Sequence, residues 1–256
     1  MDIAAASDVL RMIRELEERI GDERSMERLT ACRELAKKLP EYQADETGGL
    51  KEWSLPQMRD NHEHRHISHL YCAWPGVETQ HDVRLVESCR QAIRNRNTGN
   101  VGKDDTASHG WLHKGLVAAR LKDGEGLGEI LRLLVHSDIF YSSLLTDHNT
   151  DRCRGVYCTD TILGLQGIIQ EALVYSERGW IEFLPALPVE WKQGCVDGLL
   201  ARTRVCIRRL AWDLEKKILE AELEAYEDQE VRISCPVLQY DACYYLKQGE
   251  LRRIWI

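Results

Sequence analysis

No uninterrupted apolar run in this sequence is long enough to span a bilayer, and the chain has no basic stripe, internal repeat or low-complexity tract. The missing apolar run argues against a membrane-spanning protein. The formal net charge is −8, and no basic stripe compensates for it, which argues against binding to nucleic acid or to an anionic membrane surface. We therefore expect neither nucleic acid nor membrane among the partners.

Paired cysteine motifs are also missing. The nine cysteines are scattered from Cys32 to Cys243 without CxxC spacing. This pattern argues against a zinc ribbon and favours reduced thiols over a disulfide scaffold. The first residues, MDIAAASDVL, contain neither a basic n-region nor a long apolar h-region, so they do not resemble a signal peptide. Together these features predict a cytoplasmic protein.

The 256 residues, 43% of them hydrophobic and 30% charged, can form one large domain or two smaller ones with a sizeable core. Up to about residue 178, apolar residues recur mainly at helical spacing. The expected helices are 2–20, 25–39, 82–94, 109–121, 127–136 and 159–173. Ser25 is a candidate N-cap, 95–105 reads as a polar loop, and 146–157 reads as a long loop of the kind that lines a site.

The pattern changes at about Gly179. Apolar residues from Leu219 to Ala225 alternate with glutamates, which is the period of a strand although Glu, Ala and Leu favour helices. The sequence therefore predicts a mostly α fold of stacked helical hairpins over residues 1–178. A small antiparallel β domain is expected over residues 179–256.

Histidines are confined to the middle third of the chain, and four of them fall within eight residues. These four are His62, His64, His66 and His69, in a segment that we call the histidine stretch (residues 61–76, NHEHRHISHLYCAWPG). They could bind a metal, but no single regular structure brings three of them together with a carboxylate. A polar pocket in which histidines and Arg65 bind sugar hydroxyls fits better, and nearby aromatic residues could stack on a sugar ring.

Two carboxylates are candidates for catalysis. Glu52 lies between Leu50 and Trp53, where burial against the indole would raise its pKa and make it a general acid. A solvated loop glutamate is the alternative. Asp160 begins a predicted helix, so it is either an N-cap or a carboxylate that points into a cleft.

Several motifs resemble glycoside hydrolase family 95, which contains inverting α-L-fucosidases and some α-L-galactosidases. HRHISHLY followed by Pro75-Gly76 resembles the HRHxSHLYxxxPG signature of that family. Similar segments also occur in the family's order. They are KLPEYQADETGGLKEW (38–53), AARLKDG (118–124) and FLPALPVEWKQGCVDGLLAR (183–202).

The resemblance implies part of an (α/α)6 toroid, followed by the C-terminal β domain, and a single-displacement reaction that needs no cofactor or metal. Glu52 matches the general acid of the family. Asp160 matches a carboxylate that polarises an asparagine-activated water. The implied substrate-binding residues are His64, Arg65, His66, His69, His109 and Trp111. Family members are longer, so an upstream half-barrel chain is an expected partner beside an oligosaccharide or glycoconjugate substrate.

The sequence also departs from the family pattern. Asp160 to Gly164 reads DTILG where the family has Asp-x-Asn-Phe-Gly, and Cys72 to Trp74 replaces Gly-Leu-Tyr. The Thr-Gly-Trp-Ser stretch appears as Ala107 to Gly110 followed by Trp111. These differences indicate a divergent subgroup. We therefore expect an α-L-fucosidase-like hydrolase, with a non-catalytic carbohydrate-binding or degenerate fragment as the first alternative and a histidine-based metalloenzyme as the second.

Overall fold

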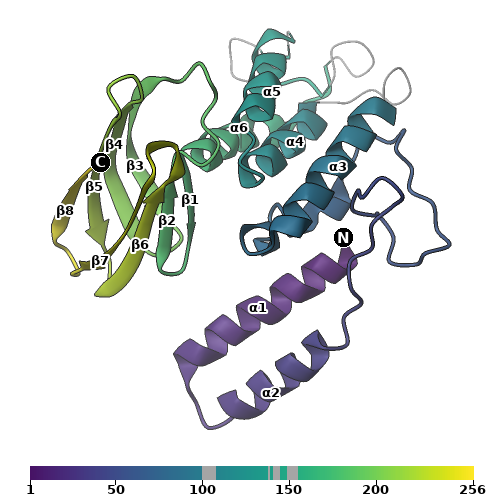
Figure 1. The fold of residues 1–256 in the computed structure, drawn as a ribbon, viewed down its shortest axis with the longest axis horizontal. Coiled ribbons are helices and arrows are strands. Elements are labelled where there is room, and N and C mark those ends of the chain that lie inside the picture. The colour runs from purple at the N-terminus through teal and green to yellow at the C-terminus, as the bar shows by residue number, and fades with distance from the viewer. Residues whose placement is uncertain (100–107, 138, 141–144, 149–154) are drawn as a thin grey trace. The chain divides into compact units, whose positions relative to one another are not determined.

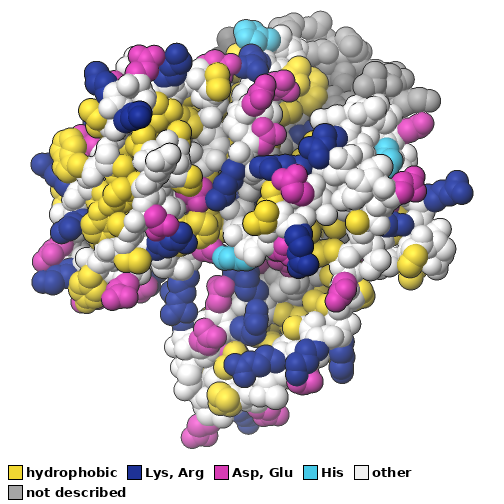
Figure 2. Space-filling model, in the orientation of Figure 1, with side chains coloured by type: hydrophobic (Ala, Val, Ile, Leu, Met, Phe, Trp, Pro, Cys, Tyr) yellow, Lys and Arg dark blue, Asp and Glu magenta, His cyan; other side chains and the backbone are white. Residues whose placement is uncertain are grey.

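The computed structural model describes residues 1–99, 108–137, 139–140, 145–148 and 155–256 (Figure 1). The chain divides into two compact units, Met1–Gly110 and Trp111–Ile256. Within the described residues, no helix is both long and apolar enough to cross a membrane. On the face shown in Figure 2, acidic and basic side chains are interspersed, as expected for a surface without a basic stripe.

The first unit opens with a hairpin of two helices, α1 (Asp2–Ile20) and α2 (Ser25–Ala36), which lie side by side in Figure 1. Polar contacts join them. Nε of Arg28 donates to Glu17 at 2.5 Å, and the hydroxyl of Ser25 donates to Glu17 at 2.9 Å. The N-cap predicted at Ser25 is wrong, because Ser25 is the first helical residue and its hydroxyl points to the neighbouring helix.

Two 3₁₀ turns, η1 (Ser68–Cys72) and η2 (Glu78–Gln80), lead to α3 (Val83–Gly99). The first part of the predicted loop 95–105 is therefore helical, and the rest of that loop lies outside the described residues. The helix continues because its last turn has partners in earlier loops. The Asn95 amide donates to Asp45 at 3.0 Å, and the end of α3 packs against His62.

The second unit contains most of α4 (Ser108–Arg120), then α5 (Gly124–His136) and α6 (Thr159–Leu173). Asp123 caps α5 by accepting from the backbone amide of Gly126 at 2.9 Å. Part of the predicted loop 146–157 lies outside the described residues, and its ends meet through an isolated bridge between Asp147 and Tyr157.

Helix α6 runs directly into β1 (Val174–Glu177), so strands begin ahead of residue 179. The other strands are β2 (Trp180–Phe183), β3 (Gln193–Ala201), β4 (Val205–Asp213), β5 (Ile218–Ala225), β6 (Gln229–Cys235), β7 (Tyr240–Leu246) and β8 (Leu251–Trp255). They form two four-stranded sheets, with orders β1-β2-β6-β7 and β3-β4-β5-β8. Apolar side chains from both sheets share one buried core.

The predicted fold class, helices followed by a small and mainly antiparallel β domain, is confirmed. Leu219 to Ala225 is a strand, and its leucines and alanines are buried while the glutamates between them are half-exposed. One detail of the prediction is wrong, because β2 pairs with β6 in parallel, with Ile181 opposite Ile233. Period-two patterning identifies a strand but not the direction of its partner.

The AARLKDG segment holds the helices of the second unit to its first sheet. The guanidinium of Arg120 is buried and donates to Glu171 at 2.5 and 2.8 Å, and it also lies 5.0 Å from the ring centre of Tyr175. Two residues later, the ammonium of Lys122 donates to the buried Glu182 at 2.8 Å. The motif is therefore explained by packing as well as by family resemblance.

Replacing Arg120 by Met should destabilise the second unit by about 3 kcal/mol, because it leaves Glu171 without its buried partner. Arg132 pairs with Glu190 at a half-exposed site, so Arg132→Met should cost less than about 1 kcal/mol. Denaturant unfolding monitored by circular dichroism checks the difference. Equal losses in the two variants would contradict the importance of the buried pair.

The contact of α3 with the histidine stretch yields a second prediction. A Cβ on Gly99 would lie 2.8 Å from the backbone oxygen of His62, whereas one on Gly167 in α6 would have its nearest neighbour at 3.8 Å. Gly99→Ala should therefore weaken protection of the last turn of α3 by about 1–3 kcal/mol. Gly167→Ala should strengthen α6 by up to about 1 kcal/mol. Amide hydrogen exchange measures the protection of both helices. Greater protection of α3 in Gly99→Ala would contradict the close contact with His62.

Candidate active site

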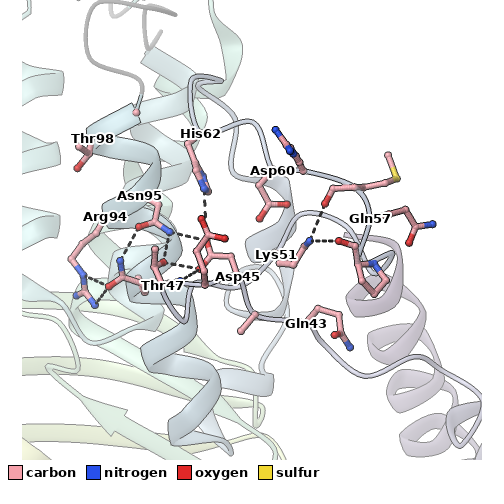
Figure 3. A pocket seen from close by; sticks show the side chains of 17 residues that line it. Gln43, Asp45, Thr47, Lys51, Gln57, Asp60, His62, Arg94, Asn95 and Thr98 are labelled. Atoms are coloured by element: carbon pink, nitrogen blue, oxygen red, sulfur yellow. Dashed lines mark hydrogen bonds and ion pairs between the residues drawn. The ribbon is translucent and has the colours of Figure 1, made fainter.

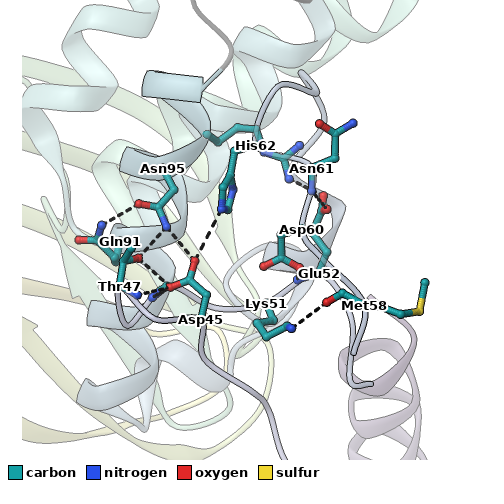
Figure 4. A network of polar contacts seen from close by, with 12 residues as sticks. Asp45, Thr47, Lys51, Glu52, Met58, Asp60, Asn61, His62, Gln91 and Asn95 are labelled. Carbon is teal, nitrogen blue, oxygen red and sulfur yellow. Dashed lines mark hydrogen bonds and ion pairs between the residues drawn. The ribbon is translucent and has the colours of Figure 1, made fainter. Parts of the chain in front are cut away.

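Glu52 lies in the loop segment between α2 and η1, and both of its carboxylate oxygens are engaged (Figure 4). One oxygen accepts from the buried guanidinium of Arg96 in α3. The other accepts from the backbone amide of Asn61 at 2.9 Å, and the amide of Glu52 itself donates to Asp60 at 3.0 Å. Residues far apart in the sequence thus fix this side chain.

These contacts decide the ionisation of Glu52. Burial alone would raise its pKa, but the hydrogen bonds from Asn61 and Arg96 outweigh burial and hold the pKa below its ordinary value. The raised pKa predicted from Leu50 and Trp53 is therefore wrong. The indole of Trp53 is 46% exposed. The cation that lowers the pKa of Glu52 is Arg96 in α3, 44 residues further along the chain.

The side chain of Glu52 opens into a cavity of about 460 Å³ together with three residues of the histidine stretch. Its polar and aromatic lining comprises Asp2, Glu52, Trp53, Ser54, His64, His66, Ser68 and His69. The rings of His64 and His66 meet edge to face at 4.8 Å, and His66 lies 5.2 Å from the ring of His109 in α4. The structure thus brings four of the predicted site residues to one cavity.

His69 is the most enclosed member of this group. It is 6% exposed, and its Nδ1 has no hydrogen-bond partner among the described residues. Burial, aided by the positive charge of Arg96, lowers the pKa of His69 to about 4. The ring is therefore neutral near pH 7, when it can both donate and accept hydrogen bonds.

Three of the predicted site residues, Arg65, Trp111 and Asp160, are not among the described residues that line this cavity. Trp111 lies in α4 and Asp160 in the first turn of α6, both in the second unit. Asp160 is exposed and is not the N-cap of α6, which is Cys158.

A second cavity of about 990 Å³ adjoins this loop and has a polar lining (Figure 3). In it, Asp45, Asp60 and His62 place potential ligand atoms within 4.8 Å of one another. Asp45 already accepts hydrogen bonds from Thr47, Gly49 and Asn95. Since its charge is satisfied in this way, we assign no metal to the group.

Sequence reasoning missed Arg96, Asp60 and Asn61, which determine the state of Glu52. Asp60 and Asn61 stand directly before the first histidine, so their position could have drawn attention to them. Arg96 offered no such signal, because it falls in a stretch that reads as a polar loop. In chemical terms, the site offers a carboxylate, imidazoles and an exposed indole, a set that suits the hydroxyls and the faces of a sugar.

Comparison with known proteins points in the same direction. The chain is 27% identical over 214 residues to "Alpha-L-fucosidase 2" of Arabidopsis thaliana, which covers 77% of this chain and 23% of that protein. It is 28% identical over 185 residues to "Probable alpha-fucosidase A" of Aspergillus oryzae, covering 66% of this chain and 25% of that protein. The chain thus spans about a quarter of the length of these relatives.

Among solved structures, a "Putative kojibiose phosphorylase from human microbiome" aligns with 96% of this chain and 36% of its own length, at 11% identity and a TM-score of 0.42. Residues 1–173 match the glycosyl hydrolase family 95 catalytic domain, and residues 175–250 match the glycoside hydrolase family 95 C-terminal domain. These two matches cover nearly the whole sequence, and the chain belongs to glycoside hydrolase family 95.

Proposed function

We propose that this chain forms part of an α-L-fucosidase-like glycoside hydrolase, with α-L-galactosides as the neighbouring substrate class. The observation that carries the proposal is the cavity in which Glu52 meets His64, His66 and His69. The names of the two relatives support the choice of fucose. An oligosaccharide or glycoconjugate would supply the sugar, and the buried free thiols among the described cysteines fit the proposed cytoplasmic setting.

In the proposed reaction, Glu52 gives a proton to the glycosidic oxygen and a water attacks the anomeric carbon from the opposite face. Asp160 would support that water through hydrogen bonds. Inverting enzymes hold their two carboxyl groups about 6.5–9.5 Å apart, which leaves room for the water. We expect Glu52 and Asp160 to face one cleft at this or a slightly larger separation. Arg65, His109 and Trp111 complete the proposed sugar-binding set.

The proposal also includes a partner. Since the chain spans about a quarter of its relatives, we expect further helices of the same catalytic domain, an upstream half-barrel, to complete the cleft. The groups that hold the attacking water would come from that part. The β domain would serve as a support for the helices, joined to them by Arg120 and Lys122.

A second candidate function is carbohydrate binding without turnover. One observation favours it, namely the pairing of Glu52 with Arg96, which keeps the candidate acid ionised. An ionised carboxylate cannot protonate a leaving group, although it still accepts hydrogen bonds from sugar hydroxyls.

Hydrolysis of an aryl α-L-fucoside and calorimetric binding of L-fucose separate these functions. We expect little or no hydrolysis by the chain alone. In a form reconstituted with the upstream half-barrel, Glu52→Gln should lower the rate of hydrolysis at least about 100-fold, because proton donation to the leaving group is lost. The exposed loop residue Glu41 provides the control, since Glu41→Gln should leave the rate unchanged. The first anomer released, followed by proton NMR, should be the inverted one.

Binding of L-fucose without hydrolysis by the reconstituted wild-type form would favour the second candidate. Neither binding nor hydrolysis by a reconstituted form that is folded by circular dichroism would overturn both assignments. Retention of full activity in Glu52→Gln would remove Glu52 from the mechanism while leaving the sugar specificity in place.

A further inference from the structure

Arg96 is the largest fully buried side chain among the described residues, with 1% of its surface exposed. It belongs to α3, and its two terminal nitrogens reach two different segments. One donates to the carboxylate of Glu52, and the other donates to the backbone oxygen of His64 at 2.7 Å. A single guanidinium thus ties the loop of the candidate acid to the histidine stretch.

This arrangement is poorly suited to stability alone. Nε of Arg96 is buried and has no acceptor among the described residues, and an unsatisfied buried donor costs about 1–3 kcal/mol. Buried ion pairs in general contribute less to stability than apolar residues of similar volume. What the guanidinium does provide is a fixed position and a fixed charge for the carboxylate that it faces.

We propose that Arg96 is a positioning residue that aligns Glu52 with the wall formed by the histidines and keeps Glu52 as a carboxylate until their ion pair opens. The inference rests on the proposed function, in which Glu52 is the acid. Once the pair opens, burial favours the protonated form of Glu52, which takes up a proton from solvent. That proton then passes to the glycosidic oxygen as the glycosidic bond breaks and the leaving group departs as an alcohol. The ion pair with Arg96 thereby determines when Glu52 is protonated and can act as the acid.

Other charged and titratable groups also surround Glu52. They are Lys51, Asp60, His64 and His66 from the loops, His69 from η1, and the Met1 amine and Asp2 from the start of the chain. Lys51 is turned to the backbone oxygen of Met58 at 2.9 Å. Burial raises the pKa of Asp60, and burial lowers that of His69. Arg96 donates directly to the Glu52 carboxylate.

The test is a carbon-13 NMR titration of glutamate side-chain carboxyl groups in the whole chain, with the Glu52 signal assigned by its loss in Glu52→Gln. In the wild type, the midpoint should lie below the ordinary glutamate value. In Arg96→Met it should rise by about one to three pH units, because the opposite charge is gone. The titration midpoint of the His69 ring should rise in Arg96→Met as well, since the charge of Arg96 disfavours the protonated form of His69.

Arg94→Met is the matched control, because Arg94 lies on the exposed side of α3 and donates to the side chain of Gln91 at 2.8 and 3.0 Å. It should leave both midpoints unchanged. Arg96→Lys retains the charge and should keep the midpoint of Glu52 below that of Arg96→Met. A role in folding alone would not separate these two variants.

An unchanged Glu52 midpoint in folded Arg96→Met would overturn the inference. If that variant does not fold, the wild type decides, since a midpoint at or above the ordinary glutamate value also overturns it. The titration needs no substrate, so its outcome is separate from that of the hydrolysis assay. Loss of the acid role in that assay would leave the measured effect of Arg96 on Glu52 in place.

Discussion

The buried guanidinium of Arg96 is the contact on which the geometry of the first unit depends. Between α2 and η1 the described chain has no helix and only an isolated bridge, and its backbone hydrogen bonds belong mainly to turns. Polar side chains add to these bonds. Arg96 holds Glu52 and His64, and the residue before it, Asn95, holds Asp45 and Thr47. Helix α3 therefore acts as the rigid element to which the loops are attached.

The same contacts give the site its chemistry. A loop that is fixed by charge keeps polar groups close to a cavity, whereas a loop fixed by apolar packing would cover them. The buried cation then acts on its neighbours in opposite directions, stabilising the ionised form of Glu52 and the neutral form of His69. A carboxylate beside an uncharged imidazole is the result, and position and ionisation have one common cause.

Regular elements could be predicted from the sequence because their signals are local. The period-two leucines of Leu219–Ala225 outweighed helix propensity because a strand buries them all on one face, as β5 does. The errors arose where distant residues decide. Asn95 to Gly99 is helical because loops earlier in the chain accept its side chains, and the direction of β2 is set by β6.

The candidate site divides in the same way. Histidine clustering and motif spacing identified the cavity wall, since these features are written in adjacent residues. The ionisation of Glu52 could not be predicted, because it depends on Arg96 and on a backbone amide at Asn61. Neighbours in sequence predict the environment of a side chain only when they are also its neighbours in space. In a loop that is held by a later helix, the contacts come from distant residues instead.

The parallel pairing of β2 with β6 has a consequence for synthesis on the ribosome. Helix α6 passes without a loop into β1, and the β1-β2 hairpin finds its next partner only when β6 has emerged, about fifty residues later. Long-range pairing of this kind closes slowly, because the intervening chain must lose its freedom first. Until then the apolar face that α6 and β1 share lacks its cover. The first sheet thus stays incomplete until β6 has emerged, and the nascent chain exposes an unpaired strand edge in the meantime.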